Sequence, residues 1–264
     1  MSEELSNAAG RNEPERQRTN ARISEELIDI TLLTARTILA CGGETYRANE
    51  CCTRILSANG ADTVDVIALP TALTLGVRCG DDYITRSASI MDRGTDLSRL
   101  DDAIAVSRGL TDGSMTPSQA RKRLTAHTAP MPLWKKVPLA AGSATCFSVV
   151  FGGGTGDALV TLASALCGMV LYYLLDRLRL PKFISYFVAS AVIAGAARLG
   201  EIWLGTDVGN VIVSGITPML PGLAVTNAMR DSINGDIVST SARMIEAFMV
   251  AVSIAAAVGA VLLI

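Results

Sequence analysis

The chain has 264 residues, of which 50% are hydrophobic and 18% charged, with a formal net charge of −2 and a mean hydropathy of +0.38. This composition is too apolar for an ordinary soluble domain, and a net charge near zero gives no reason to expect nucleic acid as a partner. Most of the charge lies before Lys136, after which apolar runs alternate with short polar breaks. We therefore expect a soluble N-terminal part followed by an integral-membrane part.

Residues 1–20 are polar and contain no apolar h-region, so we do not expect a secretory signal peptide. We expect a disordered tail over 1–22. The six cysteines lack CxxC spacing and a secreted context, which predicts reduced thiols. His127 and scattered thiols offer too few ligands for a metal site, so we expect neither metal nor cofactor.

Two helices open the soluble part. Apolar residues at helical spacing predict the first over 23–40, with Ser24 as its N-cap, and the second over 44–58. The second helix carries an unusually polar surface that includes Glu44, Tyr46, Arg47, Glu50 and Arg54. No activated nucleophile stands beside a base here. We interpret these side chains as a solvated helix face or a docking surface rather than a catalytic site.

Three strands and two further helices follow. The hydrophobic period changes to two, which predicts strands at 64–68, 73–77 and 83–90. Asp96 can cap a helix over 97–108, and the residues from Thr116 to Gln119 form a capping-box pattern that begins another. The predicted cytoplasmic domain, 23–128, is therefore a small α+β unit.

A basic linker, 129–136, leads into the membrane part and carries Trp134 where an interfacial aromatic belongs. The membrane part, 137–264, is predicted to be an all-α transmembrane domain with about five helices. Its apolar segments lie at 137–151, 158–175, 183–199, 208–229 and 244–264. The positive-inside rule places the N-terminal domain in the cytoplasm and the C-terminus on the outer side of the cell inner membrane, leaving only Arg198 near an outer end.

The fourth apolar segment, 208–229, is interrupted by two prolines. As one helix it would rise roughly 33 Å, at about 1.5 Å per residue, and Pro218 would lie near the bilayer midplane. Pro218 and Pro221, followed by Gly222, predict a kink or an unwound turn. Many secondary transporters hold substrate at such broken helices, and the alternative is a purely structural proline kink.

Three further polar residues lie near the ends of predicted membrane helices. The first segment is rich in small residues, which suits a helix buried among others. Asp157 follows its glycine run and either ends a loop or serves a proton relay. Arg198 and Glu201 are one helical turn apart, which predicts a local ion pair.

Four motifs carry a resemblance to a known family. GGETYRANECCTRI, VDVIALPTALTLGV, RGTDLSRL and above all PMLPGLAVTNAMRDSINGD resemble the threonine/serine exporter family and its bacterial two-component branch, over roughly residues 25–264. Long members contain this unit followed by a second hydrophobic unit, whereas split members encode the two separately. The chain resembles the larger subunit of the split form, which implies a second small membrane subunit as partner.

The resemblance also implies candidate site residues. Its N-terminal motif corresponds to Gly43, Glu44, Tyr46 and Arg47. The substrate-binding candidates are Thr217, Pro218, Pro221, Gly222, Asn227, Arg230, Asp231 and Asn234. The candidates for ion coupling are Asp157 and Asp236.

Together these features predict a subunit of a secondary-active, proton-coupled exporter. Its substrate would be a small molecule, threonine, serine or a dicarboxylate such as succinate, and it would work in the lipid bilayer as an oligomeric complex. The alternative is a membrane-anchored enzyme or signalling module whose active part is the cytoplasmic domain. An anchor needs only one or two plain apolar helices, which favours the exporter. The glycine run at 152–156 has no following Lys-Ser/Thr, so it does not predict an ATP-driven pump.

Overall fold

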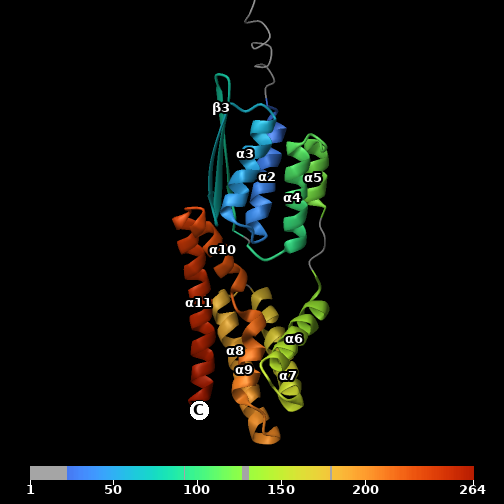
Figure 1. Ribbon diagram of the computed structural model, residues 1–264, viewed down its shortest axis with the longest axis vertical. Helices are drawn as coiled ribbons and strands as arrows, with labels where there is room; N and C mark the ends of the chain where they lie inside the picture. The colour runs from blue at the N-terminus through green and yellow to red at the C-terminus, as the bar shows by residue number, and fades with distance from the viewer. Residues whose placement is uncertain (1–22, 92, 127–130, 179) are drawn as a thin grey trace, which may run out of the picture. The chain divides into compact units, whose positions relative to one another are not determined.

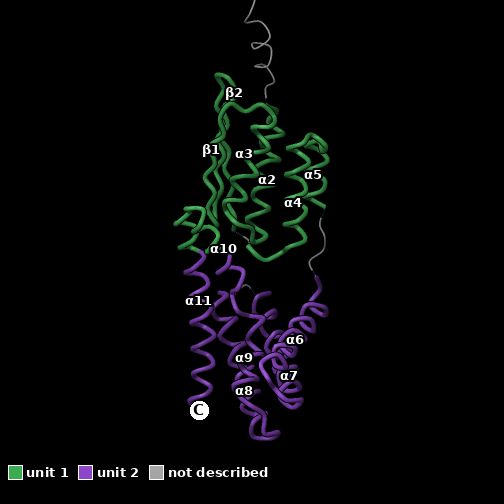
Figure 2. Tube along the Cα trace, viewed as in Figure 1, with its two compact units in different colours: residues 1–128, 227–242 green, residues 129–226, 243–264 purple. Residues whose placement is uncertain are grey.

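The computed structural model describes residues 23–91, 93–126, 131–178 and 180–264. The chain divides into two compact units, shown in Figure 2: unit 1 comprises residues 1–128 with 227–242, and unit 2 comprises 129–226 with 243–264. The predicted tail over 1–22, His127 and the first two residues of the predicted linker lie outside the described residues.

Unit 1 contains the helices that the capping signals predict. They are α2 (Glu25–Ala40), α3 (Thr45–Ala58), α4 (Leu97–Thr111) and α5 (Pro117–Thr125). The Ser24 hydroxyl accepts a hydrogen bond from the Leu27 amide at 3.2 Å, and the Asp96 carboxylate accepts one from the Arg99 amide at 3.1 Å. Thr116 and Gln119 form the predicted capping box.

The strands are β1 (Thr63–Leu69), β2 (Ala72–Cys79) and β3 (Asp82–Ser89), in an antiparallel sheet of order β1-β2-β3. Leu73, Leu75 and Val77 alternate along β2 and are buried, as the period of two predicts. Figure 1 shows the sheet beside α2 and α3, with α4 and α5 on the other side of these helices. The α+β prediction is confirmed.

The core of unit 1 lies between its layers and includes two adjacent cysteines. Ile28, Ile55 and Leu56 are fully buried there. Cys51 and Cys52, which belong to α3, pack into the same core. Burial raises the pKa of the Cys51 thiol to about 11, and it raises the pKa of Cys52 well above its ordinary value. Both side chains therefore remain neutral thiols at neutral pH and act as small apolar residues.

Unit 2 is a helical bundle. Its helices are α6 (Leu133–Val150), α7 (Thr155–Arg177), α8 (Lys182–Leu204), α9 (Val208–Ile216) and the 3-10 turn η1 (Thr217–Met219). It also contains part of α10 (Gly222–Ile233) and part of α11 (Ile237–Leu262). Small residues allow close packing, because a Cβ added to Gly168 or Gly215 would lie 2.6 or 2.7 Å from the side chain of Ile193. The predicted ion pair between Arg198 and Glu201 is confirmed at 2.9 Å.

Among the described residues, α7, α8 and α11 are long and apolar enough to cross a membrane. The count rises to four if the bent pair formed by α9 with η1 and α10 is a single span. An integral-membrane part made of helices is thus confirmed, but the predicted five spans exceed this count. α6 is a helix of 18 residues, and it falls outside the set because Lys135 and Lys136 in its first turn shorten its apolar stretch.

The fourth apolar segment breaks where the prolines predict. α9 ends at Ile216, one 3-10 turn follows, and α10 begins at Gly222, with a bend of 57° between the two parts. The prediction of a kink is confirmed. The predicted end of the segment at residue 229 is wrong, because α10 continues through the polar cluster to Ile233.

The predicted start of the last helix at residue 244 is also wrong. Gly235 adopts a left-handed conformation with φ of 82° after α10, and α11 then begins at Ile237. The Asp236 carboxylate accepts a hydrogen bond from the Ser239 amide at 3.0 Å, as an N-cap does. Capping chemistry therefore determines the start of α11, even though its first turns are more polar than a membrane helix requires.

Candidate functional site

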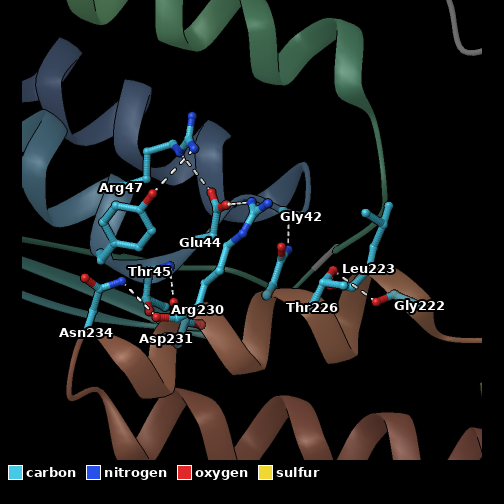
Figure 3. A network of polar contacts seen from close by, with 12 residues as sticks. Gly42, Glu44, Thr45, Arg47, Gly222, Leu223, Thr226, Arg230, Asp231 and Asn234 are labelled. Atoms are coloured by element: carbon cyan, nitrogen blue, oxygen red, sulfur yellow. Dashed lines mark hydrogen bonds and ion pairs between the residues drawn. The ribbon is translucent and has the colours of Figure 1, made fainter.

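The candidate site in unit 1 is centred on a buried carboxylate. Glu44 occupies the N-cap position of α3, and its side chain is only 5% exposed. One carboxylate oxygen accepts a hydrogen bond from the Arg230 guanidinium at 2.5 Å, and the other lies 2.9 Å from Nε of Arg47 (Figure 3). A buried charge is tolerated when it is paired in this way, so the two arginines hold Glu44 in its ionised form.

Three further hydrogen bonds join the same two segments of unit 1. The Thr45 amide donates to the Asp231 carboxylate at 3.2 Å, and the Thr45 hydroxyl donates to the Asp236 carboxylate at 2.9 Å. The Asn227 side-chain amide donates to the backbone carbonyl of Gly42 at 2.7 Å. Residues 42–45 and 227–236, far apart in sequence, therefore form one polar network, which we call the Glu44 network.

The glycine pair before α3 shapes one side of the Glu44 network. Gly42 has a left-handed φ of 87°, and a Cβ on Gly43 would lie 2.6 Å from the side chain of Ile38 and 2.8 Å from its carbonyl oxygen. The chain can therefore reverse sharply after α2 and present the first turn of α3. Amides in that turn have no acceptor within the helix, which is why the Thr45 amide can bind Asp231.

The other side of the Glu44 network is one face of α10. Asn227, Arg230 and Asp231 are spaced three and four residues apart, so they lie on the same face of a helix. Asn227 and Asp231 are buried. Asn234 donates from its side-chain amide to the backbone carbonyl of Arg230 at 2.8 Å and thereby helps to end the helix (Figure 3).

Electrostatics favour the charged form of Glu44. Burial raises the pKa of this carboxyl, but the hydrogen bond from Arg230 and the charge of Arg47 outweigh burial, so the pKa lies below its ordinary value. Arg47 also places its guanidinium 5.9 Å from the centre of the Tyr46 ring. Of the two interpretations of this surface, a solvated helix face does not fit the buried Glu44, whereas it fits Glu50, which is exposed and pairs with Arg54 at 3.1 Å.

Thr45 and Gly42 belong to the Glu44 network but were not singled out by the sequence. Thr45 contributes both an amide and a hydroxyl, and Gly42 contributes a carbonyl. A small hydroxyl residue directly after a helix N-cap was a usable signal for Thr45. A backbone carbonyl leaves no signal in the residue type.

A second polar group lies in unit 2, around Asn210 on α9. The Ser148 hydroxyl donates to the Asn210 side-chain oxygen at 2.6 Å, and the Asn210 side-chain amide donates to the carbonyls of Ser148 and Phe151, each at 3.3 Å. Asp157 accepts from the amides of Gly154 and Asp207, each at 2.8 Å. It therefore joins the start of α7 to the start of α9, which fits its interpretation as a loop-ending residue.

The remaining predicted site residues lie at the break in unit 2. Thr217 begins η1 and donates its hydroxyl to the carbonyl of Val213 at 2.7 Å. Pro218 is inside η1, Pro221 follows it, and Gly222 opens α10. The substrate-binding candidates thus fall into two groups, the break in unit 2 and the Glu44 network in unit 1, and Asp157 lies apart from both.

Residues 29–264 match the ThrE family, whose description reads "Putative threonine/serine exporter". The chain belongs to this exporter family. It is also 25% identical, over 261 residues, to a "Probable threonine/serine exporter" of Mycobacterium tuberculosis (strain ATCC 25618 / H37Rv). That alignment covers 90% of this chain and 47% of the relative, so the chain spans about half the length of the curated relative that it matches. No solved structure matches the chain.

Membership in the exporter family makes this chain a membrane protein of a transporter family and not an enzyme. The alternative of a membrane-anchored enzyme is thereby set aside. The resemblance read from the motifs is confirmed at the level of the family. Both parts of the Glu44 network and the proline break lie inside the matched residues.

In this exporter-family chain, Glu44→Gln should lower the thermal stability of unit 1, because it leaves two arginines facing a neutral amide. We expect a loss of about 1–3 kcal/mol. Arg230→Gln should cost a similar amount, and the double variant should cost less than the sum by about 0.5–3 kcal/mol. Circular dichroism melts of the detergent-purified chain measure this. Glu50→Gln, which breaks an exposed pair on the same helix, is the matched control and should change little.

Glu44→Gln should also change how the thermal stability depends on pH. Because the pKa of folded Glu44 lies below the unfolded value of about 4.3, its stabilisation is complete above that value and is lost as the pH falls through the folded pKa. The difference in melting temperature between wild type and Glu44→Gln should therefore be full near neutral pH and shrink in acid. A difference that stays constant across the pH range, or strict additivity in the double variant, would contradict the ion pair.

Proposed function

We propose that the chain is part of a secondary-active exporter of small polar metabolites, namely threonine, serine or dicarboxylates such as succinate, coupled to protons in the cell inner membrane. Family membership supports export of an amino acid. The observation that carries the proposal beyond the family is the broken helix between α9 and α10. Asp157 and Asp236 are the proposed coupling residues.

The break supplies groups that suit a carboxylate. Pro218 and Pro221 have no amide hydrogen, so the backbone leaves α-helical geometry, and the Leu220 amide bonds instead to the carbonyl of Thr217 at 3.2 Å. Amides in the first turn of α10, after Gly222, lack acceptors within the helix and lie at its positive end. We propose that these amides, with Thr217, hold the carboxylate of the substrate, as half-helix ends do in other secondary transporters.

Unit 1 supports a topology for this exporter. Residues 227–236 form hydrogen bonds with residues 42–45, so we place these two segments on the same side of the membrane. An even number of crossings must then separate them. α7 and α8 supply two, and the bent pair adds one if it is a broken span or none if it is a re-entrant loop.

We propose the broken span, which requires α6 to cross as well. Its 18 residues rise roughly 27 Å, close to a hydrocarbon core of about 30 Å, and Lys135 and Lys136 would remain in the headgroup region. α11 then forms a fifth crossing. The described residues between 23 and 126 and residues 227–242 lie in the cytoplasm in this topology, and Ile264 lies on the outer side.

We also propose that transport needs a second hydrophobic unit. The chain covers 47% of the curated relative, and the remaining length of that relative would correspond to this second unit. In the split form it would be a separate small membrane subunit, and the complex would be oligomeric. The apolar groove between α7 and α8, which is lined by Leu159, Leu199 and Trp203, has a volume of about 340 Å³, and another helix could pack against it.

Restoring a regular helix should abolish transport if the break holds the substrate. We expect Pro218→Ala combined with Pro221→Ala to reduce efflux at least about tenfold, because the freed backbone groups would return to helical hydrogen bonds. Proteoliposomes containing the chain and its second unit, loaded with labelled threonine, serine or succinate under an imposed proton gradient, measure this. Pro138→Ala, inside α6, is the matched control. Wild-type efflux in the double variant would reduce the break to a structural kink.

Thiol labelling in intact cells tests the topology, with single cysteines placed in a background that lacks the native ones. An impermeant reagent should label Phe151→Cys and Ile264→Cys, both exposed positions, and should label Ser118→Cys only after the cells are permeabilised. Phe151→Cys distinguishes the broken span from the re-entrant loop, because this position lies outside only if α6 crosses the membrane. Protection of that position would favour the re-entrant loop, and outside labelling of Ser118→Cys would reverse the orientation.

A further inference from the structure

A cleft in unit 1 plays no part in the proposed transport pathway. It lies between α3 and α4 and encloses about 240 Å³. Its polar lining is Tyr46, Arg47, Glu50, Arg54, Ser107 and Arg108. Ile38, Cys51 and Ile104 complete it on the side of the core. Three arginines around one small concavity are unusual, because like charges repel unless something compensates them.

The cleft carries more positive than negative charge. Arg54 is paired with Glu50 at 3.1 Å, and Arg47 is paired with Glu44 at 2.9 Å. Arg108 is exposed, and its side chain makes no hydrogen bond or ion pair with the part of the chain that the structure describes. The only acid in the lining is Glu50, so the local field attracts an anion.

The donors in the cleft match one class of ligand. A guanidinium presents its N–H groups as a planar fork that fits the paired oxygens of a carboxylate or a phosphate. Ser107 and the Tyr46 hydroxyl add neutral groups that can donate to the same oxygens. Sites for drug-sized ligands enclose about 300–1,000 Å³, so this smaller space suits a metabolite of a few carbons or a free phosphate.

We propose that the cleft between α3 and α4 binds a small oxyanion, carrying a carboxylate or a phosphate group, through Arg54 and Arg108. The site does not depend on transport, because it lies wholly within unit 1 and shares no residue with the break at Pro218. A ligand with net negative charge binds it more tightly than a zwitterionic amino acid does, since Glu50 is the only acid in the lining and is already paired with Arg54.

Arg47 connects this site to the Glu44 network. Its guanidinium lines the cleft and also binds Glu44, which in turn binds Arg230 on α10. An anion in the cleft competes with Glu44 for Arg47 and leaves Arg230 as the main partner of that carboxylate. Anion binding in the cleft therefore changes the ion pairing of Arg230 in the segment 227–236. The exporter could respond to a cytoplasmic metabolite in this way.

Isothermal titration calorimetry on the detergent-purified full chain tests the proposal, with succinate, inorganic phosphate and threonine as separate titrants. We expect saturable binding of succinate or phosphate, weaker binding of threonine, and loss of affinity as salt is added. Comparing the affinities for succinate and for phosphate shows whether the site prefers a carboxylate or a phosphate.

Variants locate the binding site. Arg108→Gln and Arg54→Gln should each weaken binding at least about tenfold, and Arg108→Lys should weaken it less, because it keeps the charge but loses the fork. Arg121→Gln removes the same charge from an exposed position on α5 and should bind like wild type. Arg54 and Arg108 are exposed, so the three variants at these positions should fold, and circular dichroism checks this. The absence of saturable binding of succinate and phosphate, or equal affinity in all four variants, would overturn the proposal.

Discussion

A carboxylate buried among apolar residues must be paired, and this constraint organises unit 1. Glu44 is almost fully buried, and its two partners come from its own helix, through Arg47, and from α10, through Arg230. Removing either partner would leave a buried charge with half of its compensation, which is far more costly than losing an exposed pair. Residues 227–236 are therefore held to the start of α3, although they follow four helices of unit 2 along the chain. The same segment leads into α11, so the ion pair between Glu44 and Arg230 fixes the end of α10 and the start of α11 within unit 1.

This arrangement gives two of the four motifs that carry the family resemblance a shared physical role. The residues around Glu44 form the N-terminal half of the polar network, and the residues from Asn227 to Asp236 form the other half. Each half is incomplete alone. Glu44 without Arg230 would be a buried charge with Arg47 as its remaining partner, and Asp231 without the Thr45 amide would lose one of its hydrogen bonds. The segment that begins as an apolar helix at Val208 therefore ends as part of the folded α+β unit.

Local signals in the sequence predicted much of the fold. Ser24, Asp96 and Thr116 marked helix starts correctly because N-capping depends on residues within one turn. The alternation along β2 and the prolines at 218 and 221 were equally informative, since strand period and missing amide hydrogens act locally. The burial of Glu44 could not be predicted in this way, because it depends on a partner 186 positions away. The extent of α10 and α11 was misjudged for a related reason: hydropathy marks where a helix is apolar, whereas Gly235 and Asp236 determine where these helices end and begin.

The pairing of Glu44 with Arg230 is the central claim, and hydrogen–deuterium exchange of the full chain in detergent tests it most directly. In the wild type, the amides of Thr45 and Ala48, which have acceptors, and the amides of 227–236 should be protected. Glu44→Gln should accelerate exchange in both segments together and leave the strands at 63–89 unchanged, while Glu50→Gln should alter neither segment. If Glu44→Gln accelerated exchange near residue 44 and left 227–236 as protected as in the wild type, the ion pair would not be what holds α10 in unit 1.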